Sequence, residues 1–190
     1  MRAVWVVPVV VMSAACGSEV VPAAPRASPS VSASVWAPPP CPRSGLRVSA
    51  DEADAAMGLR VMSLRIVNCG RKRLRVKGYP QVALFDAEGK ALKVRVGRGA
   101  AGVATLPELD RAPGTVSLKP GEQAVAGVAW RNLVLDGVKA AETADAVDVT
   151  VSPGTAVQRV VGVNIDLGTT GKVGVGPWVR APESQRQPSN

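Results

Sequence analysis

Apolar and polar side chains alternate with a period of two along several short segments of this 190-residue chain. The clearest alternation spans 58–67, where Met62, Leu64 and Ile66 share one side. Such alternation is typical of strands, because successive side chains of a strand point to opposite faces of the sheet. The signal recurs, among other places, at 74–77, 82–85, 92–96, 123–130 and 147–151. About eight short strands separated by Gly- and Pro-containing turns predict an all-β sandwich or barrel.

Four segments between these strands have less regular patterns. The segment 49–57 begins with capping-box spacing, which favours a short helix over an irregular crossover. The Gly- and Ala-rich segment 97–113 has no period and predicts a long loop, and the Ala-rich segment 139–146 is compatible with one helical turn. The segment 86–90 predicts a hairpin turn with Gly89 in the left-handed conformation and a returning strand after it.

The N-terminal segment has the pattern of an export signal. Met1 and Arg2 precede a thirteen-residue apolar run at 3–15. This run is shorter than the roughly 20 residues that span a membrane and has the length of a signal-peptide core. It ends in small residues followed at once by Cys16, which resembles a bacterial lipoprotein signal. We therefore expect Cys16 to carry acyl chains such as palmitate and to anchor the protein outside the cell membrane. Cleavage after Ala15 without lipidation, which gives a secreted protein, is the alternative.

Low-complexity composition predicts disorder at both ends of the mature chain. The stretch 16–40 is rich in Pro, Ser and Ala, which is typical of a disordered tether. The tail at 181–190, rich in Gln, Ser and Pro, is expected to be disordered as well. The sequence thus predicts a signal peptide at 1–15, a lipidated tether, one folded domain at 41–180 and a short tail.

The chain has three cysteines, and their number bears on the compartment of the folded domain. If Cys16 takes lipid, Cys41 and Cys69 are left as an even pair in an oxidising compartment, which favours a structural disulfide. Closing a loop of about 28 residues stabilises a domain by roughly 3.5 kcal/mol in the chain-entropy model. A redox pair is the alternative, although the two cysteines lack the close Cys-X-X-Cys spacing that lowers a thiol pKa.

The chain is basic, with 23 Lys and Arg against 15 Asp and Glu and a net charge of +8. Such an excess attracts polyanions, although charged strand faces are often simply solvated. The cationic residues are most closely spaced in a segment that we call the basic stretch, which consists of Arg71, Lys72, Arg73, Arg75 and Lys77. Alternation places Leu74 and Val76 on one face of a strand and the last three of these cations on the other. No aromatic residue interleaves the stretch as in base-stacking platforms, so we expect an anionic wall polymer or lipid as partner, and no nucleic acid.

A second basic group follows at Lys90, Lys93, Arg95 and Arg98. If its strand neighbours the basic stretch, nine cations share one surface. Such a surface would strengthen the attraction to a polyanion.

Residue types needed for most catalytic and metal sites are missing. The chain has no histidine, which removes Ser-His and Cys-His triads and nearly all zinc and copper sites. Groups of acids occur at 51–54, 108–110 and 145–148, and the first of these groups matches no calcium loop. The Gly-rich segment 168–176 is not followed by a helix, as phosphate-binding loops are, and is interpreted as strand. We expect no catalytic residue, no metal site and no cofactor.

Several short motifs occur in an order that resembles a known family. They are Cys41, the strand end 64–70, Gly78-Tyr79-Pro80, the hairpin 84–89, and 116–130 with Leu118-Lys119-Pro120-Gly121 inside it. In this order they resemble the actinobacterial exported proteins and lipoproteins of the domain of unknown function 4232. The resemblance implies an immunoglobulin-like antiparallel β-sandwich outside the membrane, with a bridge between Cys41 and Cys69. Members often carry a second cysteine pair in the C-terminal half, which this chain lacks.

Together, these observations predict a non-enzymatic, extracytoplasmic envelope module that binds an unidentified ligand. The expected partners are the membrane through the lipid anchor, an anionic wall polymer or lipid, and another envelope protein. Two alternatives remain open. One is a carboxylate-dependent wall hydrolase, which needs two acids facing each other across a cleft. The other is a structural or inhibitory partner of another envelope protein, which an exposed apolar patch would favour.

Overall fold

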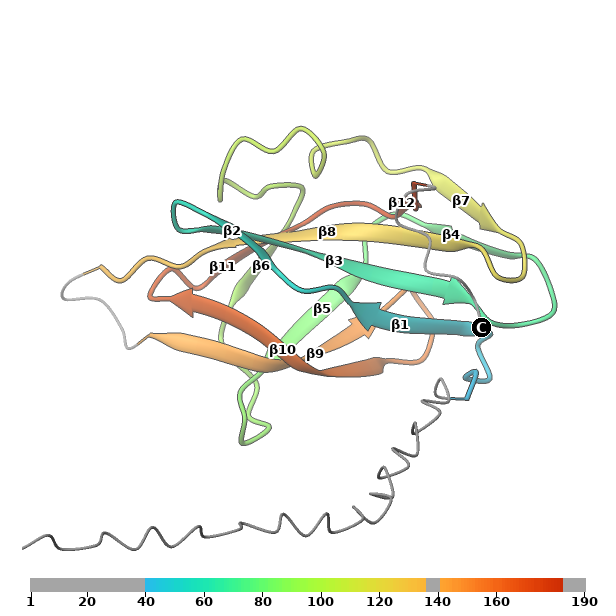
Figure 1. The fold of residues 1–190 in the computed structure, drawn as a ribbon, viewed down its shortest axis with the longest axis horizontal. Coiled ribbons are helices and arrows are strands. Elements are labelled where there is room, and N and C mark those ends of the chain that lie inside the picture. Colours follow the sequence, from blue (N-terminus) through green and yellow to red (C-terminus); the bar gives the residue numbers. More distant parts are fainter. Residues whose placement is uncertain (1–39, 136–140, 183–190) are drawn as a thin grey trace, which may run out of the picture. The chain divides into compact units, whose positions relative to one another are not determined.

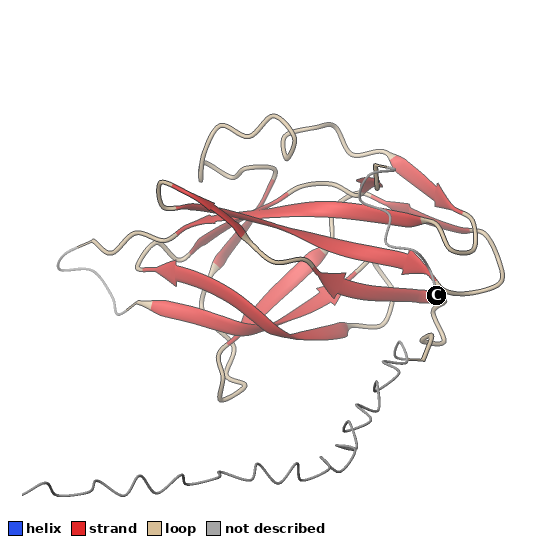
Figure 2. Ribbon diagram, in the orientation of Figure 1, coloured by secondary structure: helices blue, strands red, loops and turns tan. Residues whose placement is uncertain are grey.

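The computed structural model describes residues 40–135 and 141–182, which contain twelve β-strands and no helix (Figure 2). The strands are β1 (Leu46–Ala50), β2 (Asp54–Ala56), β3 (Leu59–Asn68), β4 (Leu74–Lys77), β5 (Gln81–Phe85), β6 (Arg95–Arg98), β7 (Thr115–Leu118), β8 (Gln123–Arg131), β9 (Glu142–Thr150), β10 (Gln158–Gly168), β11 (Lys172–Val175) and β12 (Val179–Arg180). Within these residues, no helix has the length and apolarity needed to cross a membrane.

Seven strands form the larger sheet, which is built around the pairing of β3 with β8 (Figure 1). These two strands run antiparallel from the pair Leu59↔Arg131 to the pair Val67↔Gln123. β1 extends the sheet beside β3, whereas β11 and then β6 extend it beside β8. β2 pairs with β3 and β12 pairs with β8. The pair β11–β6 is parallel and the others in this sheet are antiparallel.

A three-stranded sheet, in the order β10-β9-β5, packs across the core from the larger sheet (Figure 1). One buried cluster contains residues of both sheets, including Leu64 and Ile66 of β3, Val147 of β9 and Ile165 of β10. No strand pair among residues 40–135 and 141–182 closes the two sheets into a barrel. The predicted all-β, immunoglobulin-like sandwich is confirmed at the level of its packed sheets, with twelve strands instead of about eight.

Two tryptophans fill the centre of this core. Trp130 of β8 is 0% exposed and Trp178, just before β12, is 1% exposed. The ring N–H of Trp130 donates to Asp166 Oδ1 at 2.9 Å, and that of Trp178 donates to the Val151 carbonyl at 2.9 Å. Each large ring is therefore buried without leaving its polar N–H group unpaired.

The outer face of the larger sheet carries a smaller apolar cluster. The loop predicted at 97–113 begins only after Arg98, because β6 includes the first two residues of that range, and it packs Val103 and Leu109 against Ala129 of β8. Glycine in β11 permits the close approach, because a Cβ atom on Gly174 would lie 2.6 Å from the Gly99 carbonyl oxygen. The Gly-rich segment thus forms a strand, as predicted, and its lack of side chains makes room for the loop.

Both helical turns considered from the sequence are wrong in the described residues. β1 continues to Ala50, and β2 turns back onto β3 through Met57 and Gly58. These two residues have positive φ angles of 48° and 76°, the left-handed conformation of a two-residue hairpin turn. The Ala-rich segment is strand from Glu142 onward, because β9 begins there, and 136–140 lies outside the described residues.

The hairpin at 86–90 is confirmed, but the strand expected after it is placed differently. Gly89 has a φ of 78° and donates its N–H to the Asp86 carbonyl at 3.0 Å. Beyond a single bridge from Phe85 to Ala91, the chain leaves the smaller sheet. β6 then pairs with β11 in the larger sheet, while the apolar Leu92 packs against the main core on the way. The connection is thereby partly buried against the core, which favours its leaving the hairpin.

The close packing over β11 gives a test of the fold. In Gly174→Ala the new methyl group meets backbone carbonyls at 2.6 and 2.7 Å, which cannot move aside as a flexible side chain can. We expect a loss of about 1–3 kcal/mol in the free energy of unfolding, measured by chemical denaturation. Gly114→Ala is the control, since its Cβ meets no atom within 4 Å, and it should change stability by less than about 0.5 kcal/mol. Equal effects of the two variants would contradict the packing described.

Candidate functional site

The basic stretch occupies the turn after β3 and the exposed face of β4. β4 pairs antiparallel with β7 in a separate two-stranded sheet, where Val76 lies opposite Val116. Val76 and Leu118 are buried, whereas Arg75 and Lys77 are exposed. The strand therefore has the apolar and the basic face that its alternation predicts.

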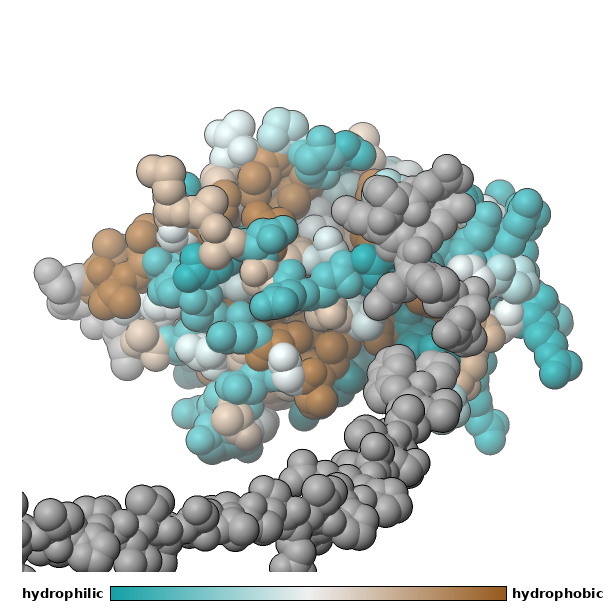
Figure 3. Space-filling view, in the orientation of Figure 1, coloured by the Kyte–Doolittle hydropathy of each residue, from teal (hydrophilic) through white to brown (hydrophobic). Residues whose placement is uncertain are grey.

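The five cations of the basic stretch are exposed and carry no ion pair within residues 40–135 and 141–182. Figure 3 shows hydrophilic residues gathered at the right-hand end of the domain, over the turn between β3 and β4. Their charges are available to an external anion, because no described carboxylate is bound to them.

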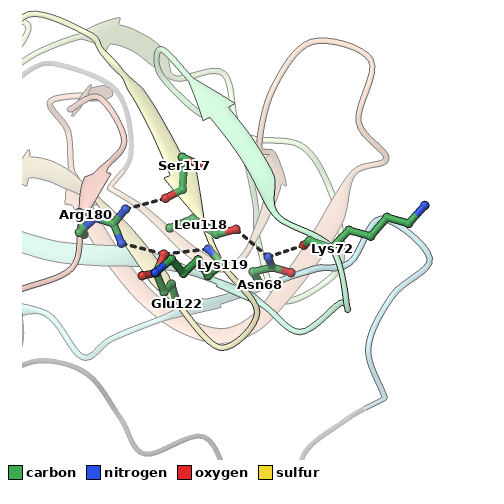
Figure 4. A network of polar contacts seen from close by, with 7 residues as sticks. All are labelled: Asn68, Lys72, Ser117, Leu118, Lys119, Glu122 and Arg180. Atoms are coloured by element: carbon green, nitrogen blue, oxygen red, sulfur yellow. Dashed lines mark hydrogen bonds and ion pairs between the residues drawn. The ribbon is translucent and has the colours of Figure 1, made fainter.

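Asn68, the last residue of β3, fixes the start of the basic stretch (Figure 4). Its side chain is completely buried. The Nδ2 group donates to the carbonyls of Lys72 and Leu118, each at 2.9 Å, and Oδ1 accepts from the Gly70 N–H at 3.1 Å. Both amide hydrogens and the amide oxygen thus have partners, as a buried polar group requires.

The backbone of Asn68 is held by the turn between β7 and β8. Its N–H donates to the Glu122 carbonyl at 3.0 Å, and its own carbonyl accepts from the Gly121 N–H at 2.8 Å. The Glu122 carboxylate accepts from the Lys119 N–H at 2.7 Å and pairs with Arg180 of β12 at 2.8 Å (Figure 4). The Arg180 guanidinium, followed by the Lys119 N–H, holds the pKa of Glu122 below its ordinary value. We call the junction at Asn68 of the β3–β4 turn and the β7–β8 turn the Asn68 corner.

The Cys41–Cys69 disulfide joins the N-terminal end of the domain to the Asn68 corner. The two Cα atoms lie 5.7 Å apart across a sequence separation of 28, and the predicted structural bridge is confirmed. Beside it, the N–H groups of Cys69 and Gly70 donate to the Gly45 carbonyl at 2.9 and 3.2 Å. The chain segment that begins the basic stretch is therefore cross-linked to the segment that begins β1.

The second basic group is not joined to the first by strand pairing. β4 pairs with β7, whereas β6, which contains Arg95 and Arg98, pairs with β11. One contact links the two regions: the Arg98 guanidinium carbon lies 5.5 Å from the ring centroid of Tyr79, just after β4. The neighbouring strands required for one nine-cation surface are therefore not present.

A cavity of about 520 Å³ between the β1–β2 connection, β3 and β10 brings three acids together. Its acidic lining residues are Asp51, Glu52 and Asp166. Asp166 accepts from the ring N–H of Trp130 at 2.9 Å and pairs with Arg60 at 3.3 Å. Both oxygens of Asp51 accept from the buried Arg65, at 3.2 and 2.5 Å. Charged partners thus hold two of the three carboxylates in structural roles, which does not favour a general acid. Across the described ranges, no three Cys, Asp or Glu side chains lie close enough together to hold a metal ion.

The sequence marks Asn68 only as the end of a strand. An Asn shortly before Gly is typical of a turn, but the pattern does not distinguish a buried side chain from a solvated one. Its partners Lys72 and Leu118, however, come from segments that only the folded chain brings together. Cys16, the predicted signal peptide and the tether up to 39 lie outside the described residues.

Comparison with known protein families gives a match over most of the chain. Residues 41–181 match a family model described as "Domain of unknown function (DUF4232)". No curated protein and no solved structure matches the chain. The matched range contains every described strand, both bridged cysteines and Asn68.

Replacing Asn68 tests the corner. Asn68→Ala removes the donor from the carbonyls of Lys72 and the buried Leu118 and leaves the Gly70 N–H with only the Gly45 carbonyl. We expect a loss of about 2–4 kcal/mol in the free energy of unfolding. Chemical denaturation with the disulfide intact measures this loss. Asn164→Ala is the control, because Asn164 is exposed, and it should be close to neutral. A loss no greater than that of the control would show that Asn68 does not hold the two turns.

Proposed function

The chain belongs to the DUF4232 family, and we propose that it is a non-enzymatic lipoprotein of the cell envelope. In this proposal the β-sandwich is tethered outside the membrane and binds an anionic envelope partner through the basic stretch. The observation that carries the proposal is the distribution of the three cysteines. Two are joined within the domain, and the third, Cys16, directly follows the apolar leader.

The disulfide supports a location outside the cytoplasm. Structural disulfides persist in oxidising compartments and are rare in the cytosol, where thiols are kept reduced. The bridge closes 28 residues at the edge of the sandwich, and it contributes roughly 3.5 kcal/mol in the chain-entropy model. A stabilisation of this size is a large part of the total for one domain, and it is gained only where the bridge can form, which supports export.

The leader and the linker supply the anchor. The apolar run at 3–15 has the length of a signal-peptide core, and Cys16 stands where lipoprotein processing leaves an acylated first residue. The Pro-rich segment between Cys16 and Cys41 then separates the domain from the lipid. One acyl chain gives only weak membrane binding, so stable anchoring needs several chains or an additional electrostatic contact.

The basic stretch supplies either this electrostatic contact with the membrane or a separate contact with the cell wall. Its side chains project from a turn that the Asn68 corner fixes, so little conformational freedom of the backbone is lost on binding. Each cation near an anionic surface contributes about 1 kcal/mol, and the attraction falls off within a Debye length. Binding through this surface should therefore be strongly salt-dependent.

Lipidation is tested by labelling with alkyne-palmitate in a bacterial host that expresses the full chain. We expect label on the membrane-bound wild-type protein and none on Cys16→Ser, which should appear in the medium. The variant Cys41→Ser/Cys69→Ser is the control, because it removes the other two cysteines and should keep the label. Label that persists in Cys16→Ser, or an unlabelled wild-type protein with its leader intact in the cytosol, would refute the lipoprotein assignment.

Binding through the basic stretch is tested by co-sedimentation with purified wall and with anionic vesicles over a salt series. We expect Arg73→Ser/Arg75→Ser/Lys77→Ser to weaken retention at least about tenfold at low salt. The control Lys90→Ser/Lys93→Ser/Arg111→Ser removes the same charge from other exposed positions and should retain most of the binding. If the two triple variants behave alike, net charge alone drives retention and the basic stretch is not the binding surface.

A further inference from the structure

Three cations lie in a row across three neighbouring strands on the outer face of the larger sheet. Lys172 of β11 is the register partner of Arg95 of β6. On the other side of β11, Val173 pairs with Trp130 of β8, so Lys172 lies across from Arg131, one position further along. Val173 and Trp130 point into the main core, which directs the three cations to the opposite face.

This row brings like charges together without the acids that would balance them. Like charges directly across from each other on paired strands are destabilising. None of the three cations forms an ion pair with any carboxylate in residues 40–135 and 141–182. Arg131 is nevertheless held in place, because its Nε donates to the Val103 carbonyl at 3.1 Å and its Nη1 to the Met57 carbonyl at 3.4 Å. Its remaining N–H groups are available to a ligand.

The row lines a cavity of about 420 Å³. Two threonines that follow β10 build one wall of it, together with the segment after β8. The Thr169 hydroxyl accepts from the Leu135 N–H at 2.9 Å, and the Thr170 hydroxyl lies 3.1 Å from the Arg131 carbonyl, to which it donates. The Thr169 N–H donates to the Leu133 carbonyl at 2.9 Å. The cavity wall is therefore fixed by hydrogen bonds and not by loop packing alone.

The segment after β8 makes the other part of the cavity apolar. Leu133 is 42% exposed and Leu135 is 54% exposed, and both line the cavity beside the cations. Figure 3 shows a hydrophobic patch at the left-hand end of the domain, over the segment that follows β8. An exposed apolar patch next to a cationic cavity indicates a binding site for an amphiphilic anion.

We propose that this cavity binds a phosphate group that carries a short apolar substituent. Three cations balance a phosphate dianion better than a single carboxylate, and guanidinium groups bind phosphate in a bidentate manner. Leu133 and Leu135 then cover the apolar substituent. A volume near 420 Å³ is at the small end of ligand sites, which favours a short chain or only the head of a longer lipid. The site is separate from the basic stretch, and it stands independently of the lipoprotein assignment.

The test is a calorimetric titration of the purified full chain with hexyl phosphate. We expect saturable binding at one site, and Arg95→Ser/Lys172→Ser should weaken it at least tenfold. Lys90→Ser/Lys93→Ser is the charge-matched control, because both residues are exposed and lie outside the cavity lining, and it should bind as the wild-type protein does. Thermal unfolding checks that each variant is folded; loss of the repulsion between Arg95 and Lys172 should leave the midpoint unchanged or raise it.

The apolar part of the site is tested by Leu135→Ser. This variant should bind hexyl phosphate more weakly than the wild-type protein but bind inorganic phosphate equally well. Vesicles containing short-chain phosphatidic acid identify the source of the bound phosphate group. Retention on these vesicles that depends on Arg95 and Lys172 indicates the head of a lipid. Binding of hexyl phosphate without retention on the vesicles indicates a free organic phosphate. The proposal is overturned if hexyl phosphate does not saturate one site, or if the charge-matched control loses as much affinity as Arg95→Ser/Lys172→Ser.

Discussion

The buried amide of Asn68 is the interaction on which the arrangement of this domain depends most. It ends β3, which pairs with β1 and with β8 in the larger sheet, and both of its amide hydrogens are donated to carbonyls of other segments. Its backbone is bound in turn by the β7–β8 turn. Because an unpaired buried amide is costly, the loss of any one of these bonds destabilises the arrangement that the others hold. The residue therefore couples the direction in which β3 ends to the position of β4.

The disulfide and the Asn68 corner act on the same place by different means. The bridge restricts the unfolded chain, whereas the corner stabilises the folded one. Together they fix a short sheet, β4–β7, that shares few strand bonds with the rest of the sandwich. Five cations with no bound carboxylate among the described residues are thereby presented on a rigid support. This is the arrangement expected of a surface that binds a polyanion without catalysing a reaction.

Local sequence patterns correctly predicted features that depend on neighbouring residues. They failed for features that depend on pairing between strands distant in the sequence. Alternation gave the faces of β4, and the left-handed Gly89 followed from its turn. The helix expected at 49–57 is wrong because β2 pairs with β3 instead, through a turn in which Met57 adopts a positive φ that its residue type does not suggest. The row formed by Arg95, Lys172 and Arg131 depends on register across β6, β11 and β8, one pair of which is parallel. The apolar pattern of each strand fixes which face its side chains take, but it does not show which residue of a distant strand lies opposite.

Native-state hydrogen exchange tests the central claim most directly. In Asn68→Ala with the disulfide intact, the amides of Gly70 and Gly121 and those of the β4–β7 pair should lose protection together, because one residue holds both turns. The amides of the β9–β10 pair, which share no hydrogen bond with Asn68, should keep theirs. Unchanged protection of β4 and β7, or an equal loss in β9 and β10, would contradict the account.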